Sequence, residues 1–526
     1  MQGVVSRHDL SCCAARSLLR CGGASLVFAF LVLSIFGRPA CAETIEEALA
    51  DAYLINPVLN AERARVRAID EQVAFAKSGL RPFIFGSADT AFQNQHTTIG
   101  GGGGTTAPSN VGLLTGPLNG PFPAPSVANP TPVTGAIPLN QAFGAAEGDS
   151  QDDGVTNPRG YSVNLTQPVF EGFRNLNAIR QAKSTVQAAR EGLRTVEQTV
   201  LLDAATAYVN VVRDTAIVRL RENDVSVLTE QLKATKDRFD VGEVTRTDVA
   251  QAEARRSEAL ATLAAAQANL KTSRAAYEQV IGHPPGNLVT PASIRHLLPS
   301  TLNESMTLGD GENPLILTSV YNEEASLYAV EQIMGELLPD VQLEAQYQKR
   351  FDQFSTNDSV ETTTVVGRLN VPFYQGGGVS ARVRQAKETN NQLKKEVEDA
   401  RLRVHADVIA NWGILQSSGP AITSAEAAVA ANKIALTGVR EEEKVGQRTT
   451  LDVLDAQREL LNSQIGLVTA LRDRVVAEYS LYTAVGRMDA QTLGLPVPYY
   501  DPLQHYDIVK NKLFGLRPPP PPAPDE

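Results

Sequence analysis

The second half of this chain repeats the first at a fixed spacing. Residues 179–183 (IRQAK) recur at 383–387 (VRQAK), 204 positions later. Nearer the N-terminus the spacing becomes 257, as between Pro82 and Pro339. A repeat of this kind predicts two similar structural halves, residues 43–286 and 304–487, joined by a linker at 287–303. The 204-residue spacing also relates Pro168 to Pro372, Val241-Gly242 to Val445-Gly446, Thr247-Asp248 to Leu451-Asp452, and Ile281-Gly282 to Val485-Gly486.

The change of spacing means that the first half contains about 53 additional residues, and composition locates them. Residues 100–158 consist largely of Gly, Pro, Ser, Thr and Asn, without helical or strand periodicity. We therefore predict a long loop at about 94–160.

Each half is expected to contain two strands. Residues 341–348 alternate apolar and polar side chains without a break, which is typical of a sheet with one apolar face. Residues 161–166 and 365–370 alternate in the same way, and 82–93 less regularly. Because proline cannot donate to a strand ladder, Pro168 and Pro372 are expected to mark strand ends.

Two exceptionally long helices are the other main expectation. Residues 174–240 and 379–444 have apolar residues at helical spacing and few breakers, which predicts two helices of about 100 Å. Gly419-Pro420 is expected to kink or break the second one. Each long helix turns at a Val-Gly pair and returns, over 247–281 and 450–485. Single helices are expected upstream of the strands, at about 45–78 and 308–336.

The N-terminus resembles a secretory signal at 1–42. An apolar run of about 13 residues follows several arginines, and Ala40-Cys41-Ala42 provides a small-x-small cleavage pattern. A lipoprotein signal with Cys41 as the acylated residue is the alternative. All four cysteines lie in this leader, so cleavage after Ala42 would exclude disulfides and thiolate metal sites from the mature chain.

Composition and motifs exclude several classes of function. The formal net charge of −11 argues against nucleic-acid binding, which needs clustered Lys and Arg. No zinc-protease or phosphate-loop motif is present, so we expect no enzyme and no cofactor. After Glu43 no apolar stretch is long enough for a membrane helix, so a membrane could be crossed only as a closed barrel. Because four strands cannot close a barrel alone, that interpretation requires oligomerisation.

Three segments resemble the TolC family of outer-membrane efflux and type I secretion ducts: 44–49 with Asn56-Pro57, 165–172 (LTQPVFEG), and 445–455 (VGQRTTLDVLD). The resemblance covers roughly residues 43–487. It implies a homotrimer with a 12-stranded barrel in the outer membrane, four strands per chain, and a long α-helical coiled-coil tunnel in the periplasm. It also implies two partners, a periplasmic adaptor (membrane fusion protein) and an inner-membrane ABC or RND pump. The loop at 94–160 would then face outward.

Asp452 and Asp455 are the main candidate site residues. They lie three apart on one helix face, so a trimer would stack them as two rings of carboxylates, which can bind or be blocked by multivalent cations. The alternative is that they simply favour the start of a helix. In the family the matching aspartates line the constriction at the closed end.

The resemblance implies further roles around the two turns. Arg448 matches an arginine that links to the neighbouring coil, with Thr247 as its counterpart. Asp248 matches an aspartate tied to a tyrosine, but here Glu443 stands at that tyrosine's position, so the tie would be repulsive. The expected adaptor contacts are the tip residues Val241, Gly242, Thr245, Val445, Gly446 and Thr449.

A coiled-coil scaffold in the periplasm that never spans a membrane is the alternative function. Residues 488–526 fall outside the repeat and form a C-terminal extension with a Pro-rich tail. The exported cargo and the role of the tail cannot be deduced from the sequence.

Overall fold

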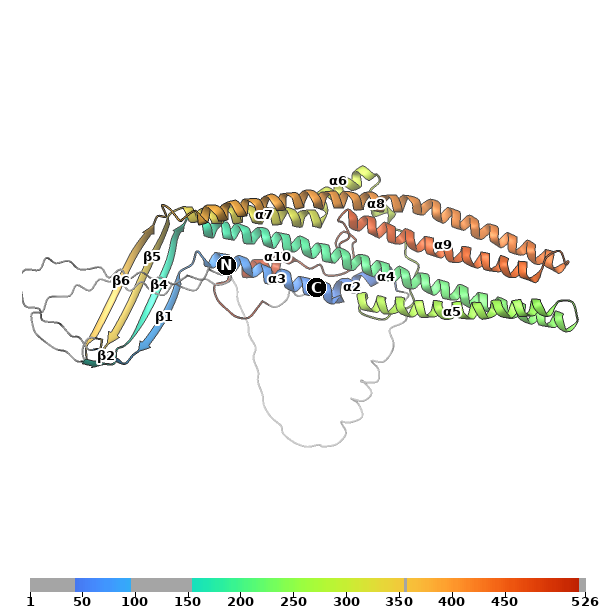
Figure 1. Ribbon diagram of the computed structural model, residues 1–526, viewed down its shortest axis with the longest axis horizontal. Helices are drawn as coiled ribbons and strands as arrows, with labels where there is room; N and C mark the ends of the chain where they lie inside the picture. The colour runs from blue at the N-terminus through green and yellow to red at the C-terminus, as the bar shows by residue number, and fades with distance from the viewer. Residues whose placement is uncertain (1–42, 96–153, 354–356, 520–526) are drawn as a thin grey trace, which may run out of the picture. The chain divides into compact units, whose positions relative to one another are not determined.

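The chain is described by a computed structural model covering residues 43–95, 154–353 and 357–519 (Figure 1). The predicted signal peptide with its cysteines, residues 96–153 of the predicted loop, and residues 520–526 of the Pro-rich tail lie outside the described residues. The chain divides into a helical unit (residues 1–79, 171–338 and 372–526) and a sheet unit (residues 80–170 and 339–371). Each unit is described by itself.

The sheet unit contains a four-stranded sheet formed, in spatial order, by β1 (Phe83–Thr90), β4 (Arg159–Glu171), β5 (Asp340–Phe351) and β6 (Ser359–Asn370). The pairs β1–β4 and β5–β6 are antiparallel. Two short strands, β2 (Gln93–Gln95) and β3 (Gly154–Thr156), form a separate antiparallel pair. The four strands predicted from alternation are therefore present.

The register of β5 and β6 explains their alternating sequences. Val341 lies opposite Leu369, so apolar residues of both strands share one face. On the other face Arg368 pairs with Glu344 at 3.0 Å between Nη2 and Oε2. The predicted separation into an apolar and a polar face is confirmed for this hairpin except at Val366, which lies on the polar face opposite Glu344.

One proline does not mark a strand end as predicted. Pro168 lies inside β4, whereas Pro372 follows the end of β6 as expected. The ladder between β1 and β4 runs only from Arg159 to Thr166, so Pro168 lies beyond it. Its missing N–H therefore removes no bond to β1.

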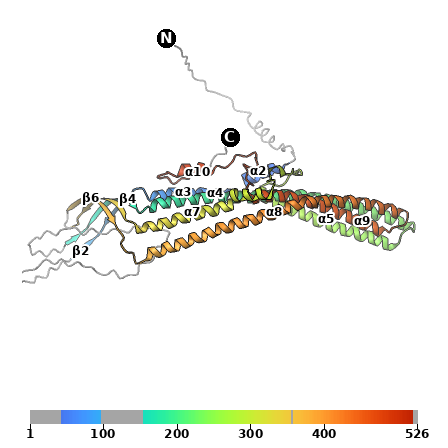
Figure 2. The same cartoon turned by 90° about the horizontal axis from the view of Figure 1, so that it is seen from above.

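The helical unit is built around α4 and α8, which have 67 residues each. This confirms the two predicted long helices. Each forms a hairpin with the helix that follows it, and the two hairpins pack against each other (Figures 1 and 2). Among the described helices, none has the length and apolarity needed to span a membrane. The helices are α2 (Ile45–Ile55), α3 (Pro57–Ser78), α4 (Arg174–Asp240), α5 (Arg246–Ile281), α6 (Leu302–Glu312), α7 (Pro314–Met334), α8 (Gly378–Lys444), α9 (Thr450–Ala484) and α10 (Pro502–Val509), with short 3-10 turns η2 (Arg295–Leu297) and η3 (Gly335–Leu337).

Each predicted upstream helix is in fact two helices, so this part of the prediction was wrong. Asn56 leaves the helical conformation and caps α3, its side chain accepting hydrogen bonds from the N–H groups of Val58 and Leu59. Pro57 follows at the first helical position, where its missing N–H does no harm. Asn313 and Pro314 separate α6 from α7 in the same manner.

Of the two outcomes expected at Gly419-Pro420, a kink or a break, the break is wrong, because α8 continues through both residues. Proline removes one backbone hydrogen bond of the helix. Just before it, the hydroxyl groups of Ser417 and Ser418 donate to the carbonyls of Ile414 and Leu415. The helix is uninterrupted in the presence of these bonds, and it packs along α9.

The core of the helical unit is large and includes the C-terminal extension. Tyr208, Tyr277 and Tyr482 are almost fully buried in it. Met488 and Leu495, which follow the repeat, are buried in the same cluster. Further on, α10 packs against α3, and His505 Nδ1 lies 3.0 Å from the buried Asp70 Oδ2. The extension is thus a folded part of this unit up to α10.

Candidate functional site at the hairpin tips

Both hairpins end in the same type of turn. The N–H of Gly242 donates to Phe239 O and that of Glu243 to Arg238 O, the two bonds of a Schellman motif. Gly446 and Gln447 make the equivalent bonds at the end of α8. Gly242 and Gly446 have φ values of +85° and +78°, a conformation that L side chains adopt only with strain. Glycine is therefore required at both tips by the backbone alone. The valines just before them, Val241 and Val445, are about 70% exposed.

The return helices begin with matching capping boxes. Thr449 N and Oγ1 each lie 2.9 Å from Asp452 Oδ2, and the N–H of Asp452 donates back to Thr449 Oγ1. Thr245 and Asp248 make the same bonds at the start of α5. Thr247, the second residue of α5, is exposed. Asp248 and Asp452 thus both have a structural role in starting a helix.

The charge of Asp452 is well stabilised. Hydrogen bonds from the backbone and side chain of Thr449 lower the pKa of the Asp452 carboxyl group, with a smaller contribution from Arg448. Asp452 therefore remains ionised well below neutral pH, as a ring that recognises cations requires.

Asp455 has a different environment from Asp452. Its Oδ1 lies 2.9 Å from Arg255 Nη2 on α5 and 3.6 Å from Arg458 Nη2 on its own helix. Arg255 also contacts Glu258 at 3.0 Å. The two predicted ring aspartates share a helix, but Asp455 joins the two hairpins through an arginine.

Glu443 also joins the two hairpins. Its Oε1 lies 3.0 Å from Arg238 Nη1 in the last turn of α4, and it accepts a hydrogen bond from Thr450. Asp248 bonds within its own capping box, so the structure does not bring Asp248 and Glu443 together. The expected repulsion is replaced by an attraction between Arg238 and Glu443.

Arg448 bonds within its own hairpin in the single chain. Its Nε lies 3.0 Å from Glu442 Oε2, and this contact raises the pKa of the guanidinium. The structure does not bring it to Thr247, its expected partner in a neighbouring coil.

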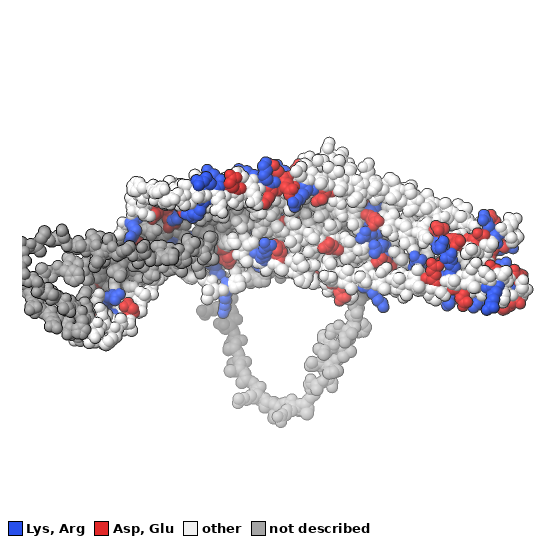
Figure 3. All heavy atoms as spheres, viewed as in Figure 1, with Lys and Arg blue, Asp and Glu red and all other residues white. Residues whose placement is uncertain are grey.

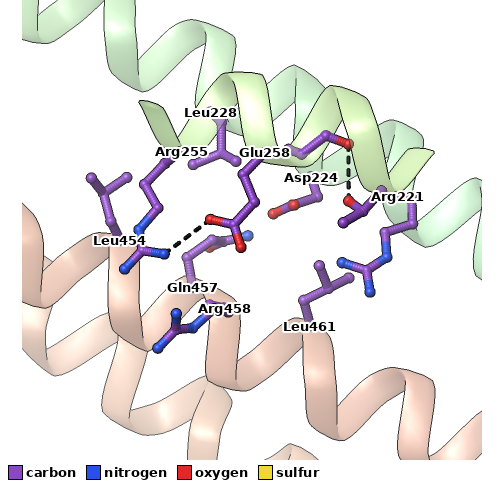
Figure 4. A pocket seen from close by; sticks show the side chains of 11 residues that line it. Arg221, Asp224, Leu228, Arg255, Glu258, Leu454, Gln457, Arg458 and Leu461 are labelled. Carbon is purple, nitrogen blue, oxygen red and sulfur yellow. Dashed lines mark hydrogen bonds and ion pairs between the residues drawn. The ribbon is translucent and has the colours of Figure 1, made fainter. Parts of the chain in front are cut away.

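A small cavity lies between the hairpins, several helical turns from the tips on α4 and α5 (Figure 4). It has a volume of about 50 Å³, and charged side chains from both hairpins point into it. Asp224 is buried there, and this desolvation raises the pKa of its carboxyl group. The lining residues are Arg221, Asp224, Leu228, Arg255, Glu258, Ala259, Thr262, Leu454, Gln457, Arg458 and Leu461.

Apolar packing near the tips is thin. Leu454 of α9 inserts between α4 and α5, in a cluster with only four other buried apolar residues: Leu228, Leu232, Ala252 and Ala259. The main core elsewhere in this unit has many more. Charged side chains of both signs gather over this end of the hairpins (Figure 3). Local separation of the hairpins is therefore easiest at the tips.

Arg238 and Arg255 were not predicted from the sequence, although two signals were available. Glu441, Glu442 and Glu443 lie in the last turn of α8, where the helix dipole disfavours acidic residues, so a cationic partner could have been expected. Arg255 and its neighbour Arg256 are the only cations between Thr247 and Ala268, an Ala-rich stretch. No group of three or more potential metal ligands is found within the described ranges.

Comparison with known proteins gives a consistent result. The profile of the family described as outer membrane efflux protein matches residues 136–283 and 311–487. The outer membrane efflux protein BepC of Brucella suis is 38% identical over 94% of this chain and 97% of its own length. The outer membrane protein TolC of Escherichia coli is 24% identical, over 69% and 76% respectively. In structure, the CmeC outer membrane channel of Campylobacter jejuni superposes with a TM-score of 0.69 over 89% of both chains at 14% identity, which shows a shared fold.

Proposed function

Since this chain belongs to the outer membrane efflux protein family, of the TolC type, we propose that it is a passive exit duct in the outer membrane. It serves an efflux or type I secretion system that spans the cell envelope. The family is one of transport channels, and the chain's role is conduction rather than catalysis. Its helical tunnel lies in the periplasm and opens there when an adaptor and an inner-membrane pump engage it.

The observation that carries this proposal is that the four-stranded sheet has two open edges. Among the strands that the structure describes, β1 and β6 each have a neighbour on one side only. Apolar side chains of the sheet are also strongly exposed in the single chain, as at Ile84, Val365 and Leu369 (61%, 66% and 64%). An open edge facing lipid is unfavourable because its backbone groups lack hydrogen-bond partners. Three copies of the sheet would close a 12-stranded barrel with this apolar surface toward lipid.

The helical unit gives similar support for a trimer. Leu402, Ile409, Ile414 and Ile434 of α8 are each at least half exposed. Apolar residues repeated along one long helix are unfavourable in water and are typical of a helix that packs against a further chain. Three copies of the four long helices would form the wall of the tunnel.

The hairpin tips form the closed periplasmic end of the duct. Thin packing there favours opening, while Arg238–Glu443 and Arg255–Asp455 hold the two hairpins of one chain together. Asp452 and Asp455 face the constriction as two carboxylate rings. Arg448 reaches Thr247 of the neighbouring copy in the closed trimer.

The exposed tips receive the adaptor. Val241 and Val445 are exposed apolar residues at the two turns, beside Gly242 and Gly446 and the capping threonines Thr245 and Thr449. These six residues form two similar contact points per chain, which suits adaptor hairpins that bind both turns. The pump is of the ABC or RND type, as the resemblance implies.

The scaffold alternative is disfavoured by the same sheet. A scaffold that stays in the periplasm has no use for a four-stranded sheet with exposed apolar side chains and two open edges. It predicts a protein that is soluble without detergent, whereas the duct requires extraction from the outer membrane.

Deletion of the chain is expected to identify its cargo. A strain without it should lose severalfold in tolerance of toxic small molecules, or lose a protein from its medium, because a closed exit blocks the whole pathway. A plasmid copy should restore the lost property. Retention of both properties, with the protein found in the soluble fraction of the parent strain, would favour the scaffold.

A further inference from the structure

The hairpin tips contain an arginine that changes what the proposed carboxylate rings can bind. Arg255 Nη2 lies 2.9 Å from Asp455 Oδ1, at normal distance for a charge-assisted hydrogen bond. The arginine comes from α5 and the aspartate from α9, so the bond links the two hairpins. Arg255 is also fixed by Glu258 at 3.0 Å, one turn further along α5.

The surroundings of the two aspartates differ in net charge. Asp455 and Glu258 are balanced by Arg255 and Arg458, which all lie within one contact network. Asp452 belongs to a second group with Glu442 and Arg448, where two acids face a single arginine. One excess negative charge per chain therefore remains at Asp452 and none at Asp455.

From this difference we infer that Arg255 is a built-in counter-ion that neutralises Asp455, so that multivalent cations are recognised at the closed end mainly by Asp452. The inference rests on the proposed duct and assigns the cation selectivity of its constriction. A cation approaching Asp455 must displace a guanidinium that is held by two carboxylates, whereas Asp452 is hydrogen-bonded only to neutral groups of Thr449.

Two substitutions separate the charge of this pair from its role as a bond. Arg255→Gln and Asp455→Asn break the same contact, so any loosening of the hairpins is common to both. Arg255→Gln leaves an additional carboxylate at the constriction, and Asp455→Asn leaves an additional arginine. Any difference in cation block between them is therefore due to charge.

The experiment is channel recording from the purified full-length protein in planar bilayers, with Mg²⁺ and the inert trivalent ion hexaamminecobalt(III) as blockers. Arg255→Gln should be blocked at a concentration at least about tenfold lower than Asp455→Asn, the ratio that ~1.4 kcal/mol would give. Asp452→Asn should require severalfold more blocker than the wild type. Arg256→Gln is the matched control, because Arg256 is the adjacent arginine and contacts Thr229 of its own hairpin. Its block should not change.

Equal block in Arg255→Gln and Asp455→Asn would overturn the inference. So would an Arg255→Gln/Asp455→Asn double variant, which keeps the net charge, if it loses block as strongly as Asp452→Asn. If the protein forms no channels, or if block persists when both aspartates are removed, the proposed duct or its gate fails instead. In that case thermal unfolding in detergent still tests the pair: the midpoint shifts of Arg255→Gln and Asp455→Asn should be non-additive in the double variant, and additive shifts would refute the bond.

Discussion

Replacing both Asp452 and Asp455 by asparagine is expected to raise the concentration of multivalent cation that blocks the channel at least about tenfold, a change of only ~1.4 kcal/mol. Two unit charges 4 Å apart near a protein surface attract each other by ~4 kcal/mol, so even part of this attraction is sufficient. Asparagine retains an acceptor for the capping bonds from Thr449, which keeps the start of α9 intact. Bilayer recordings with hexaamminecobalt(III) measure the effect.

Glu441→Gln provides the control for the double variant. Glu441 lies near the same turn and pairs with Lys444 at 2.7 Å, so its replacement also removes a negative charge from the tip. Block should remain as in the wild type. Unchanged block in the Asp452/Asp455 variant, or equal relief by Glu441→Gln, would contradict a specific ring at these aspartates.

Glu197 is expected to have the largest effect on stability, and the effect depends on pH. Its carboxylate accepts a hydrogen bond from Ala490 N at 2.8 Å, between α4 and the C-terminal extension. Burial raises the pKa of the Glu197 carboxyl group to about 7, and the nearby Asp489 adds to the shift, although the hydrogen bond from Ala490 N and the charges of Arg63 and Arg194 oppose it. The folded chain therefore holds a proton at pH values where the unfolded chain has lost it.

The direction of the pH effect follows from the ordinary pKa of the glutamate, 4.5, and its pKa in the folded chain, about 7. Between pH 4.5 and about 7 the free energy of unfolding falls as the pH rises, because only the folded state still binds the proton. The full shift corresponds to roughly 3 kcal/mol, and partial solvent access reduces this to about 2 kcal/mol. Glutamine cannot ionise, so Glu197→Gln removes the free-energy cost of a buried carboxylate at high pH. The variant should therefore have a higher melting temperature than the wild type at pH 8 and nearly the same one at pH 4.

Circular dichroism melting of the detergent-solubilised protein measures this difference. Glu222→Gln, an exposed glutamate on the same helix, is the control and should leave the pH dependence unchanged. A Glu197→Gln variant with the same pH dependence as the wild type would contradict the assignment of the shift to Glu197.

The sequence was sufficient for the elements whose pattern extends over many residues. Alternation from 341 to 348 predicts β5, and the apolar spacing of 174–240 predicts α4, because each pattern reports directly on the face that is buried. Individual prolines were less informative. The extent of the β1–β4 ladder at Pro168 and the continuation of α8 through Pro420 are not visible in the local sequence.

The candidate site was predictable in part for a similar reason. The resemblance located the turns and the aspartates, and capping physics explains Asp248 and Asp452. Neither the resemblance nor capping could identify Arg238 and Arg255 as site residues, because their partners lie about 200 positions away in the sequence. Glu443 is an example. Its match to a position that faces Asp248 predicts repulsion, whereas the structure places Arg238 beside it.

Single-channel recording of the purified mature protein tests the central proposal most directly. If three copies close one barrel, each insertion into a planar bilayer should raise the conductance by a step of the same size. The steps should be small, because the hairpin tips are closed. Removal of both inter-hairpin ion pairs, with Arg238→Gln and Arg255→Gln, should increase the size of each step. A folded, helical protein that never produces such steps in the bilayer would contradict the proposal that this chain forms a duct.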